Sequence, residues 1–276
     1  MFKKFYKFIL KIEIKSIWYE FGYKLFKKEN KIIPFVISIA SIFYLVKNIN
    51  SIDLRKVELN YLNFLNLMAV FSYVVYIILR SKFWVVLSKG KQGDDKLYLA
   101  SQIGKFLPGK IGPTYYRTIF FQDSFTNQAK LSFFEVINIS FSHIVISILF
   151  FLNFKFALIA LIIILFLADS KYKILFLTSI FNYFAFLSLA IQFNENLIES
   201  TLLVSILIFS AALSLFVNII PFGLGIREGI FLFLFNFFKL NSNFVELIIL
   251  SRFISIFIEC IIYTTYFIYK KKYYAK

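Results

Sequence analysis

Two short segments carry glycine, proline and basic residues within an otherwise strongly apolar chain. The first, residues 104–117, reads GKFLPGKIGPTYYR, and the second, residues 218–228, reads NIIPFGLGIRE. Glycine lets backbone N–H groups point toward an anion, and a helix that begins just after the break adds the positive end of its dipole. Arginine can hold a phosphate through two parallel hydrogen bonds, whereas lysine supplies a point charge. Both segments therefore contain the residue types that bind a phosphate group.

The two segments also match one another when they are aligned on their prolines. Residues 106–108 and 111–112 correspond to residues 219–221 and 224–225, with two apolar residues, proline, two variable positions, an apolar residue and glycine in each. Such a pair in the two halves of a transporter-like chain is typical of discontinuous helices around a central site. Irregular backbone persists at membrane depth only where protein or a wet cavity satisfies it. We therefore expect two broken or re-entrant segments that line one site, with two helix-ending surface loops as the alternative.

Ionisable residues inside apolar runs are costly in a membrane and are further candidates for function. Glu135 and Glu259 lie in such runs, and Arg227 and Arg252 are the candidates to neutralise them across helices. For Glu135 the alternative is a side chain that reaches back to the interface, because it lies only four residues into its run. His143 is expected to be a hydrogen-bonded packing residue more than a proton relay.

These patterns define one set of candidate substrate-binding residues. The set comprises Lys105, Pro108, Gly109, Lys110, Gly112, Arg117, Glu135, Pro221, Gly223, Gly225, Arg227, Glu228 and Arg252. The alternative, which is strongest for Lys110, is that these cations only fix loops on the cytoplasmic side. No His/Asp or Ser/His constellation has a spacing that suits catalysis, and the nucleotide-binding pattern Gly-x-x-x-x-Gly-Lys-Ser/Thr does not occur. We expect no enzymatic activity, no cofactor and no ATP hydrolysis by this chain.

Composition places these residues in a membrane protein. Hydrophobic residues make up 60% of the 276 residues, against roughly 45–50% in a soluble domain. Cys260 is the only cysteine, which excludes a disulfide scaffold, and with one histidine the chain has no thiolate or His-rich metal centre. The net charge of +16 lies between apolar runs, so it indicates the positive-inside rule and not a nucleic-acid partner.

The apolar runs and the basic residues between them predict the topology. The runs are 32–46, 61–79, 131–152, 155–168, 172–192, 201–220, 228–238 and 244–269. Nine Lys/Arg precede the first run, four follow the last, and five lie between residues 80 and 96. Both termini and the 80–96 loop are therefore expected in the cytoplasm, with eight crossings, or six if the two shortest runs do not span. The stretch 80–130 is expected to be mostly loop.

The chain divides into three parts on this basis. Residues 1–31 are expected to form a basic amphipathic cytoplasmic segment, with a topology-setting tail of no fixed structure as the alternative. Residues 32–270 are the transmembrane domain, and residues 271–276 are a basic cytoplasmic tail. The predicted fold is all-α: a polytopic helical protein of the bacterial or archaeal plasma (inner) membrane, with about eight transmembrane helices.

The two glycine- and proline-containing segments carry a family resemblance. Residues 107–112 with Arg117, and then residues 221–228, resemble the two signatures of the flippase-like membrane region of lysylphosphatidylglycerol synthases. The usual form of the second signature, Pro-x-Gly-Gly-x-Gly-x-Arg-Glu, is shortened here by one residue. The resemblance spans roughly residues 30–270 and implies a role in handling lipids across the bilayer, with links to envelope glycans in shorter members. It implies no aminoacyl transferase, because the soluble synthase domain has no counterpart.

The function expected from the sequence is binding and translocation, or assisted translocation, of an anionic lipid. The lipid would be a phospholipid or a polyprenyl-phosphate-linked glycan, with the phosphate on the basic segments and the tail in the bilayer. One alternative is a membrane-embedded lipid-modifying transferase with His143 or Glu135 as base. Another is a scaffold for an envelope-glycan enzyme, and such an enzyme is a possible partner in either case.

Overall fold

The computed structural model describes residues 64–90, 93–106, 112–193, 196–216, 226–238 and 244–274. These residues are helical apart from short connections and contain no strand, as the sequence predicts. The long helices are α4 (Phe64–Ser88), α7 (Phe125–Leu152), α9 (Ser170–Phe193), α10 (Leu197–Phe216) and α12 (Phe244–Tyr274). The short ones are α5 (Asp94–Ser101), the 3-10 helix η2 (Gln102–Phe106), α6 (Gly112–Phe121), α8 (Phe154–Leu167) and α11 (Ile226–Phe237).

Five of these helices are long and apolar enough to cross a membrane. They are Phe64–Ser88, Phe125–Leu152, Ser170–Gln192, Leu197–Ser214 and the Leu250–Tyr269 part of α12. The chain is therefore a membrane-embedded, multi-pass helical protein. At 1.5 Å per residue, α8 is about 21 Å long and α11 about 18 Å, less than the roughly 30 Å of hydrocarbon. The predicted run at 32–46 and the basic segment at 1–31 lie outside the described residues.

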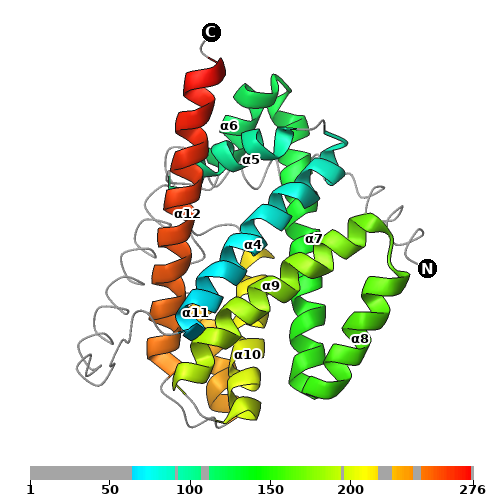
Figure 1. Ribbon diagram of the computed structural model, residues 1–276, viewed down its shortest axis with the longest axis vertical. Helices are drawn as coiled ribbons and strands as arrows, with labels where there is room; N and C mark the ends of the chain where they lie inside the picture. Colours follow the sequence, from blue (N-terminus) through cyan, green and yellow to red (C-terminus); the bar gives the residue numbers. More distant parts are fainter. Residues whose placement is uncertain are drawn as a thin grey trace, which may run out of the picture.

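The helices form a bundle around α4 and α9, which pack along each other (Figure 1). α7 packs against α9 and α10, and α12 runs the length of the molecule beside α4, α5 and η2. α5 and α6 gather at the end of the bundle where α12 finishes, whereas α8 lies at the periphery between α7 and α9 (Figure 1). The short helices α5, η2 and α6 are thereby held against three long ones.

The buried face of each long helix follows helical spacing. In α4 the buried residues Ala69, Tyr73, Ile77, Ser81 and Trp84 recur every three to four positions. On α10, Ser205, Ser210 and Ser214 donate to carbonyls of their own helix, as Ser205 does to that of Thr201 at 2.7 Å. Small residues that satisfy their own hydroxyls let membrane helices approach closely.

The expectation of a loop over residues 80–130 is wrong. α4 continues past Arg80 to Ser88, and α5, η2 and α6 occupy most of the rest. The helix continues because residues 83–87 are apolar and Trp84 and Phe83 return to the buried face. The basic residue that suggested the end of the helix is neutralised by a carboxylate from α7, as described below.

Candidate functional site

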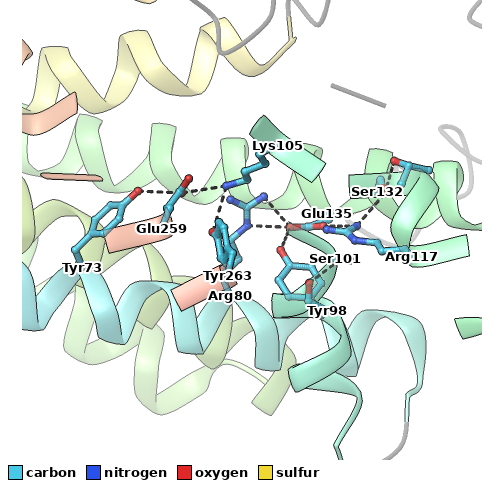
Figure 2. Close-up of polar contacts among 11 residues, drawn as sticks. Tyr73, Arg80, Tyr98, Ser101, Lys105, Arg117, Ser132, Glu135, Glu259 and Tyr263 are labelled. Atoms are coloured by element: carbon cyan, nitrogen blue, oxygen red, sulfur yellow. Dashed lines mark hydrogen bonds and ion pairs between the residues drawn. The ribbon is translucent and has the colours of Figure 1, made fainter. Parts of the chain in front are cut away.

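A buried carboxylate on α7 joins four helices through its contacts. Arg80 of α4 donates to Oε1 of Glu135 from Nε at 2.9 Å and lies 2.8 Å away through Nη2. Arg117 of α6 places Nη1 2.9 Å from Oε2, and the Tyr98 hydroxyl of α5 donates to Oε1 (Figure 2). Arg117 Nη1 also donates to Ser132 at 2.9 Å. Both oxygens of Glu135 are therefore occupied by charge-assisted hydrogen bonds, which are the stronger kind.

This inner cluster of Arg80, Tyr98, Arg117 and Glu135 is closed to solvent on its Arg117 side. The side chains of Glu135 and Arg117 are only 2% and 3% exposed, whereas Arg80 is 17% exposed. Arg117 also stacks over the Tyr98 ring, with its guanidinium carbon 4.5 Å from the ring centroid. Both side chains are therefore enclosed by protein and paired with each other.

A second ion pair joins η2 to α12. Lys105 Nζ lies 3.0 Å from Oε1 of Glu259, and the Tyr73 hydroxyl donates to the same oxygen at 3.2 Å. Lys105 also donates to the Tyr263 hydroxyl at 3.4 Å and lies 5.3 Å from that ring's centroid. The side chains of Lys105 and Glu259 are 24% and 14% exposed. This outer pair is therefore held by fewer bonds than the inner cluster and is more open.

The two parts form one row of charges. Figure 2 shows Glu259, Lys105, Arg80, Glu135 and Arg117 following one another between α12 and α6. Arg80 and Lys105 are neighbours in this row and repel each other electrostatically. Three cations and two carboxylates leave the row with one excess positive charge. Because the like-charged pair is also its more exposed part, the row is suited to receive an anion there.

Glycines in the first segment allow η2 and α6 to meet. A Cβ on Gly112 would overlap the backbone of Gly104, and one on Gly104 would overlap Gly112. The two ends of the segment thus lie backbone against backbone, which brings Lys105 and Arg117 into the same site. Pro108, Gly109 and Lys110 lie outside the described residues.

Arg227, from the second segment, lies at the start of α11 and contacts α12 eight residues before Glu259. Its Nη2 donates to Ser251 at 3.3 Å, and its guanidinium is 5.9 Å from the Phe186 ring. Phe186 in turn lies 6.2 Å from Tyr73, which bonds Glu259. Ser251 precedes Glu259 by eight residues on α12, or about 12 Å along the axis. Arg227 is therefore near the row of charges but separated from it by aromatic rings.

The remaining predicted residues divide between described and undescribed parts. Pro221, Gly223 and Gly225, and the side chain of Glu228, lie outside the described residues. Arg252 is half-buried on α12, next to the serine that Arg227 contacts. Glu135 is neutralised by Arg80 and Arg117 and Glu259 by Lys105, where the sequence suggested Arg227 or Arg252 for both.

His143 joins α7 to α9. Its Nδ1 lies 2.7 Å from the Ile139 carbonyl, which can only accept, so Nδ1 carries the proton. Nε2 then accepts from the Asn182 amide, 2.8 Å away. Ser142 and Ser179 add a further bond of 2.6 Å between the same helices. These contacts are those of a hydrogen-bonded packing residue, which is the role expected from the sequence.

Sequence reasoning missed Arg80 and the tyrosines of the site. The positive-inside pattern places Arg80 among loop cations, although an apolar run precedes it and residues 83–87 are apolar again after Ser81 and Lys82. Tyr73 and Tyr76 precede it by seven and four positions, on the same face of a helix. A basic residue between two nearby apolar stretches, aligned with tyrosines at helical spacing, is the available signal.

Neither metal chemistry nor a known relative adds to this description. Over the ranges that the structure covers, no three His, Cys, Asp or Glu side chains lie close enough to hold a metal ion. Comparison with models of protein families, with curated proteins and with solved structures finds no match.

Proposed function

We propose that the chain binds an anionic lipid by its phosphate group and carries it, or helps to carry it, across the membrane. The observation that supports this most is the row of five charged side chains, which has more cations than carboxylates inside a helical membrane protein. Among the described residues these five side chains sum to one positive charge, and charged residues inside a membrane protein mark substrate or ion pathways. A phosphate would supply the missing negative charge.

Arg80 and Lys105 are the groups proposed to contact the phosphate. They are the more exposed cations of the row, and they are neighbours whose mutual repulsion an anion would relieve. Arg80 is oriented by Glu135, and Lys105 donates to the hydroxyl of Tyr263. Fixed orientation of this kind reduces the side-chain entropy that is lost when the ligand binds. Arg117 is proposed to support the site by holding Glu135 and not to touch the lipid.

The lipid tail is proposed to lie against the outer face of α12. Phe253, Phe257 and Ile261 are exposed there at intervals of four residues. Glu259 is offset from Phe257 and Ile261 by about 200° around the helix, so it faces inward while they face outward. A headgroup at Lys105 would thus have apolar surface beside it. This arrangement agrees with the resemblance to the flippase-like region of lysylphosphatidylglycerol synthases, which stays a prediction.

The test is lipid movement in liposomes that contain the purified protein. Phosphatidylglycerol with a fluorescent NBD group on its tail is quenched from outside by dithionite. The wild-type protein should raise the quenched fraction above the half that lies in the outer leaflet, and Lys105→Ala should remove most of this increase. Lys130→Ala is the matched control, because Lys130 is an exposed lysine of α7 and should move lipid normally. Equal behaviour of the wild-type protein and protein-free liposomes would contradict the proposal.

A further inference from the structure

Within the proposed site, one cation is already occupied by a carboxylate of the chain itself. Lys105 holds Glu259 at 3.0 Å, in the position where a phosphate oxygen of the lipid would have to bind. We propose that Glu259 is an internal competitor that occupies Lys105 before the lipid binds and is displaced by the phosphate. This inference rests on the proposed function and names the residue that sets its selectivity for charge.

The contacts of the two carboxylates show why Glu259, and not Glu135, is the displaceable one. Glu135 receives bonds from two arginines and a tyrosine on both of its oxygens, and it is almost completely buried. Glu259 receives its bonds from Lys105 and Tyr73 on one oxygen only and is more exposed. Lysine is a point charge on a flexible stem and releases a partner more readily than a bidentate arginine does.

Displacement leaves Glu259 with a partner. The Tyr73 hydroxyl donates to it at 3.2 Å from α4 and can continue to do so after Lys105 has turned toward the lipid. The side chain therefore moves a short distance and does not enter hydrocarbon alone. A phosphate can also make a contact that Glu259 does not make. Its tetrahedral oxygens can contact Lys105 and Arg80 together, whereas Glu259 contacts Lys105 and Tyr73, and the carboxylate on Arg80 is that of Glu135.

Competition of this kind selects the ligand by its charge. A neutral headgroup cannot replace a carboxylate on a lysine, because it would leave Lys105 and Glu259 separated without compensation. A phosphate with net negative charge can replace the carboxylate, because it neutralises Lys105 itself. Removal of the Glu259 charge should therefore strengthen the binding of an anionic lipid, and it should do so only while Lys105 is present.

The experiment measures lipid affinity for the purified full chain in detergent. The probe is tail-labelled NBD-phosphatidylglycerol, and the reference is NBD-diacylglycerol, which has the same tail and no phosphate. Glu259→Gln should bind the phosphatidylglycerol probe roughly tenfold more tightly than the wild-type protein, with unchanged affinity for diacylglycerol. Asp169→Asn is the matched control, since it removes one negative charge from the exposed connection between α8 and α9 and should change neither affinity.

Two further variants keep the test decisive. Glu259→Gln combined with Lys105→Ala should lose the gain, because the cation for which Glu259 competes is then missing. Tyr73→Phe, which removes only a hydroxyl, should weaken phosphatidylglycerol binding and leave diacylglycerol binding unchanged, because the displaced carboxylate then loses its remaining partner. This variant can be used if Glu259→Gln does not fold. The inference is overturned if the wild-type protein binds phosphatidylglycerol and Glu259→Gln binds it no more tightly. Where Glu259→Gln does not fold, it is overturned if Tyr73→Phe binds phosphatidylglycerol as tightly as the wild-type protein does. If every form, wild type included, binds phosphatidylglycerol and diacylglycerol equally, the proposed function itself fails.

Discussion

Lys105 and Glu259 are 154 positions apart in the chain, yet Nζ of the lysine lies 3.0 Å from Oε1 of the glutamate. The pair ties η2, which leads into the first glycine- and proline-containing segment, to the last helix of the protein. The segment on which the sequence places most candidate residues is thus anchored to α12. Any movement of the segment relative to α12 has to break or exchange this ion pair.

Exchanging the two charges tests whether the pair stabilises the fold. Lys105→Glu places two carboxylates together, and Glu259→Lys places a second lysine beside Lys105, so each change should lower stability by about 1–3 kcal/mol. The double variant restores opposite charges and should recover a large part of the loss. The measurement is the melting temperature of the detergent-solubilised protein, with Lys130→Glu on the exposed face of α7 as a control of equal charge change. Additive losses in the double variant would show that the two residues do not interact.

Glu135 should be the most sensitive residue of the site. Glu135→Gln leaves Arg80 and Arg117 beside a neutral amide at a buried position, and loss of one partner from a buried ion pair costs about 3–5 kcal/mol. Arg117→Ala should cost less, about 1–3 kcal/mol, because Arg80 still neutralises the carboxylate. Thermal unfolding of both variants should give this order. The reverse order would mean that Arg117 has the larger structural role.

The sequence predicts the class of fold because hydrophobic burial in a membrane depends on composition and run length. The runs 131–152 and 172–192 correspond closely to α7 and α9. The prediction from sequence is wrong at Arg80, because the positive-inside rule treats a cation after an apolar run as a loop residue. Whether such a residue ends a helix depends on a carboxylate 55 positions away, and only the packing of α7 on α4 decides that.

The candidate site shows the same division. Lys105, Arg117 and Glu135 were identifiable one by one, because ionisable residues in apolar surroundings are conspicuous. Which of these residues pair with one another cannot be predicted from the sequence, because the pairing depends on which helices are neighbours and how each helix is rotated about its axis. Arg117 and Arg227 look alike in sequence, as arginines beside a glycine- and proline-containing segment. In the structure Arg117 is buried against Glu135, whereas Arg227 lies beside the Phe186 ring and donates to Ser251.

Glycine 112 should be intolerant of a side chain. A Cβ at Gly112 would overlap the backbone of Gly104, and backbone cannot move aside as a side-chain end can. Gly112→Ala should therefore destabilise the protein by about 1–3 kcal/mol, as overpacking does. Gly229→Ala is the control: a Cβ there meets nothing within 4 Å, and alanine in a helix is favoured by about 0.5–1 kcal/mol. The melting temperatures should move in opposite directions, and a neutral Gly112→Ala would contradict the close approach of η2 and α6.

The connection before α5 and the C-terminal end of α12 should lie on one side of the membrane. Lys96 is 5.4 Å from the Tyr269 ring centroid, so these two regions meet at the same end of the bundle (Figure 1). Their many cations predict that this side is the cytoplasm. Alkaline phosphatase, which is active only in the periplasm, should be inactive when fused after residue 276 or inserted at residues 90–93. Activity at one site and not the other would contradict the shared side, and activity at both would reverse the orientation.

Arg227 should be needed for lipid movement more than for folding. It is half-buried and bonds Ser251, whereas Glu135 is almost completely buried between two arginines. Arg227→Ala should therefore lower the melting temperature much less than Glu135→Gln does. If it contacts the lipid phosphate on the path past Phe186, its loss removes charge-assisted bonding of about 1.5–3 kcal/mol, a roughly 10- to 150-fold loss of affinity. Arg227→Lys should restore part of the function, because lysine keeps the charge but not the planar fork.

The two readouts separate a ligand-binding role of Arg227 from a structural one. Phosphatidylglycerol movement in liposomes and the melting temperature in detergent are measured for Arg227→Ala, Arg227→Lys and Ser251→Ala. The serine variant removes the observed bond but keeps the guanidinium, so it should move lipid nearly as well as the wild-type protein. Loss of transport with little loss of melting temperature in Arg227→Ala alone places its guanidinium on the lipid path. A Ser251→Ala variant that is as inactive as Arg227→Ala, with an equally lowered melting temperature, makes the Arg227–Ser251 bond a structural contact and removes Arg227 from the binding site.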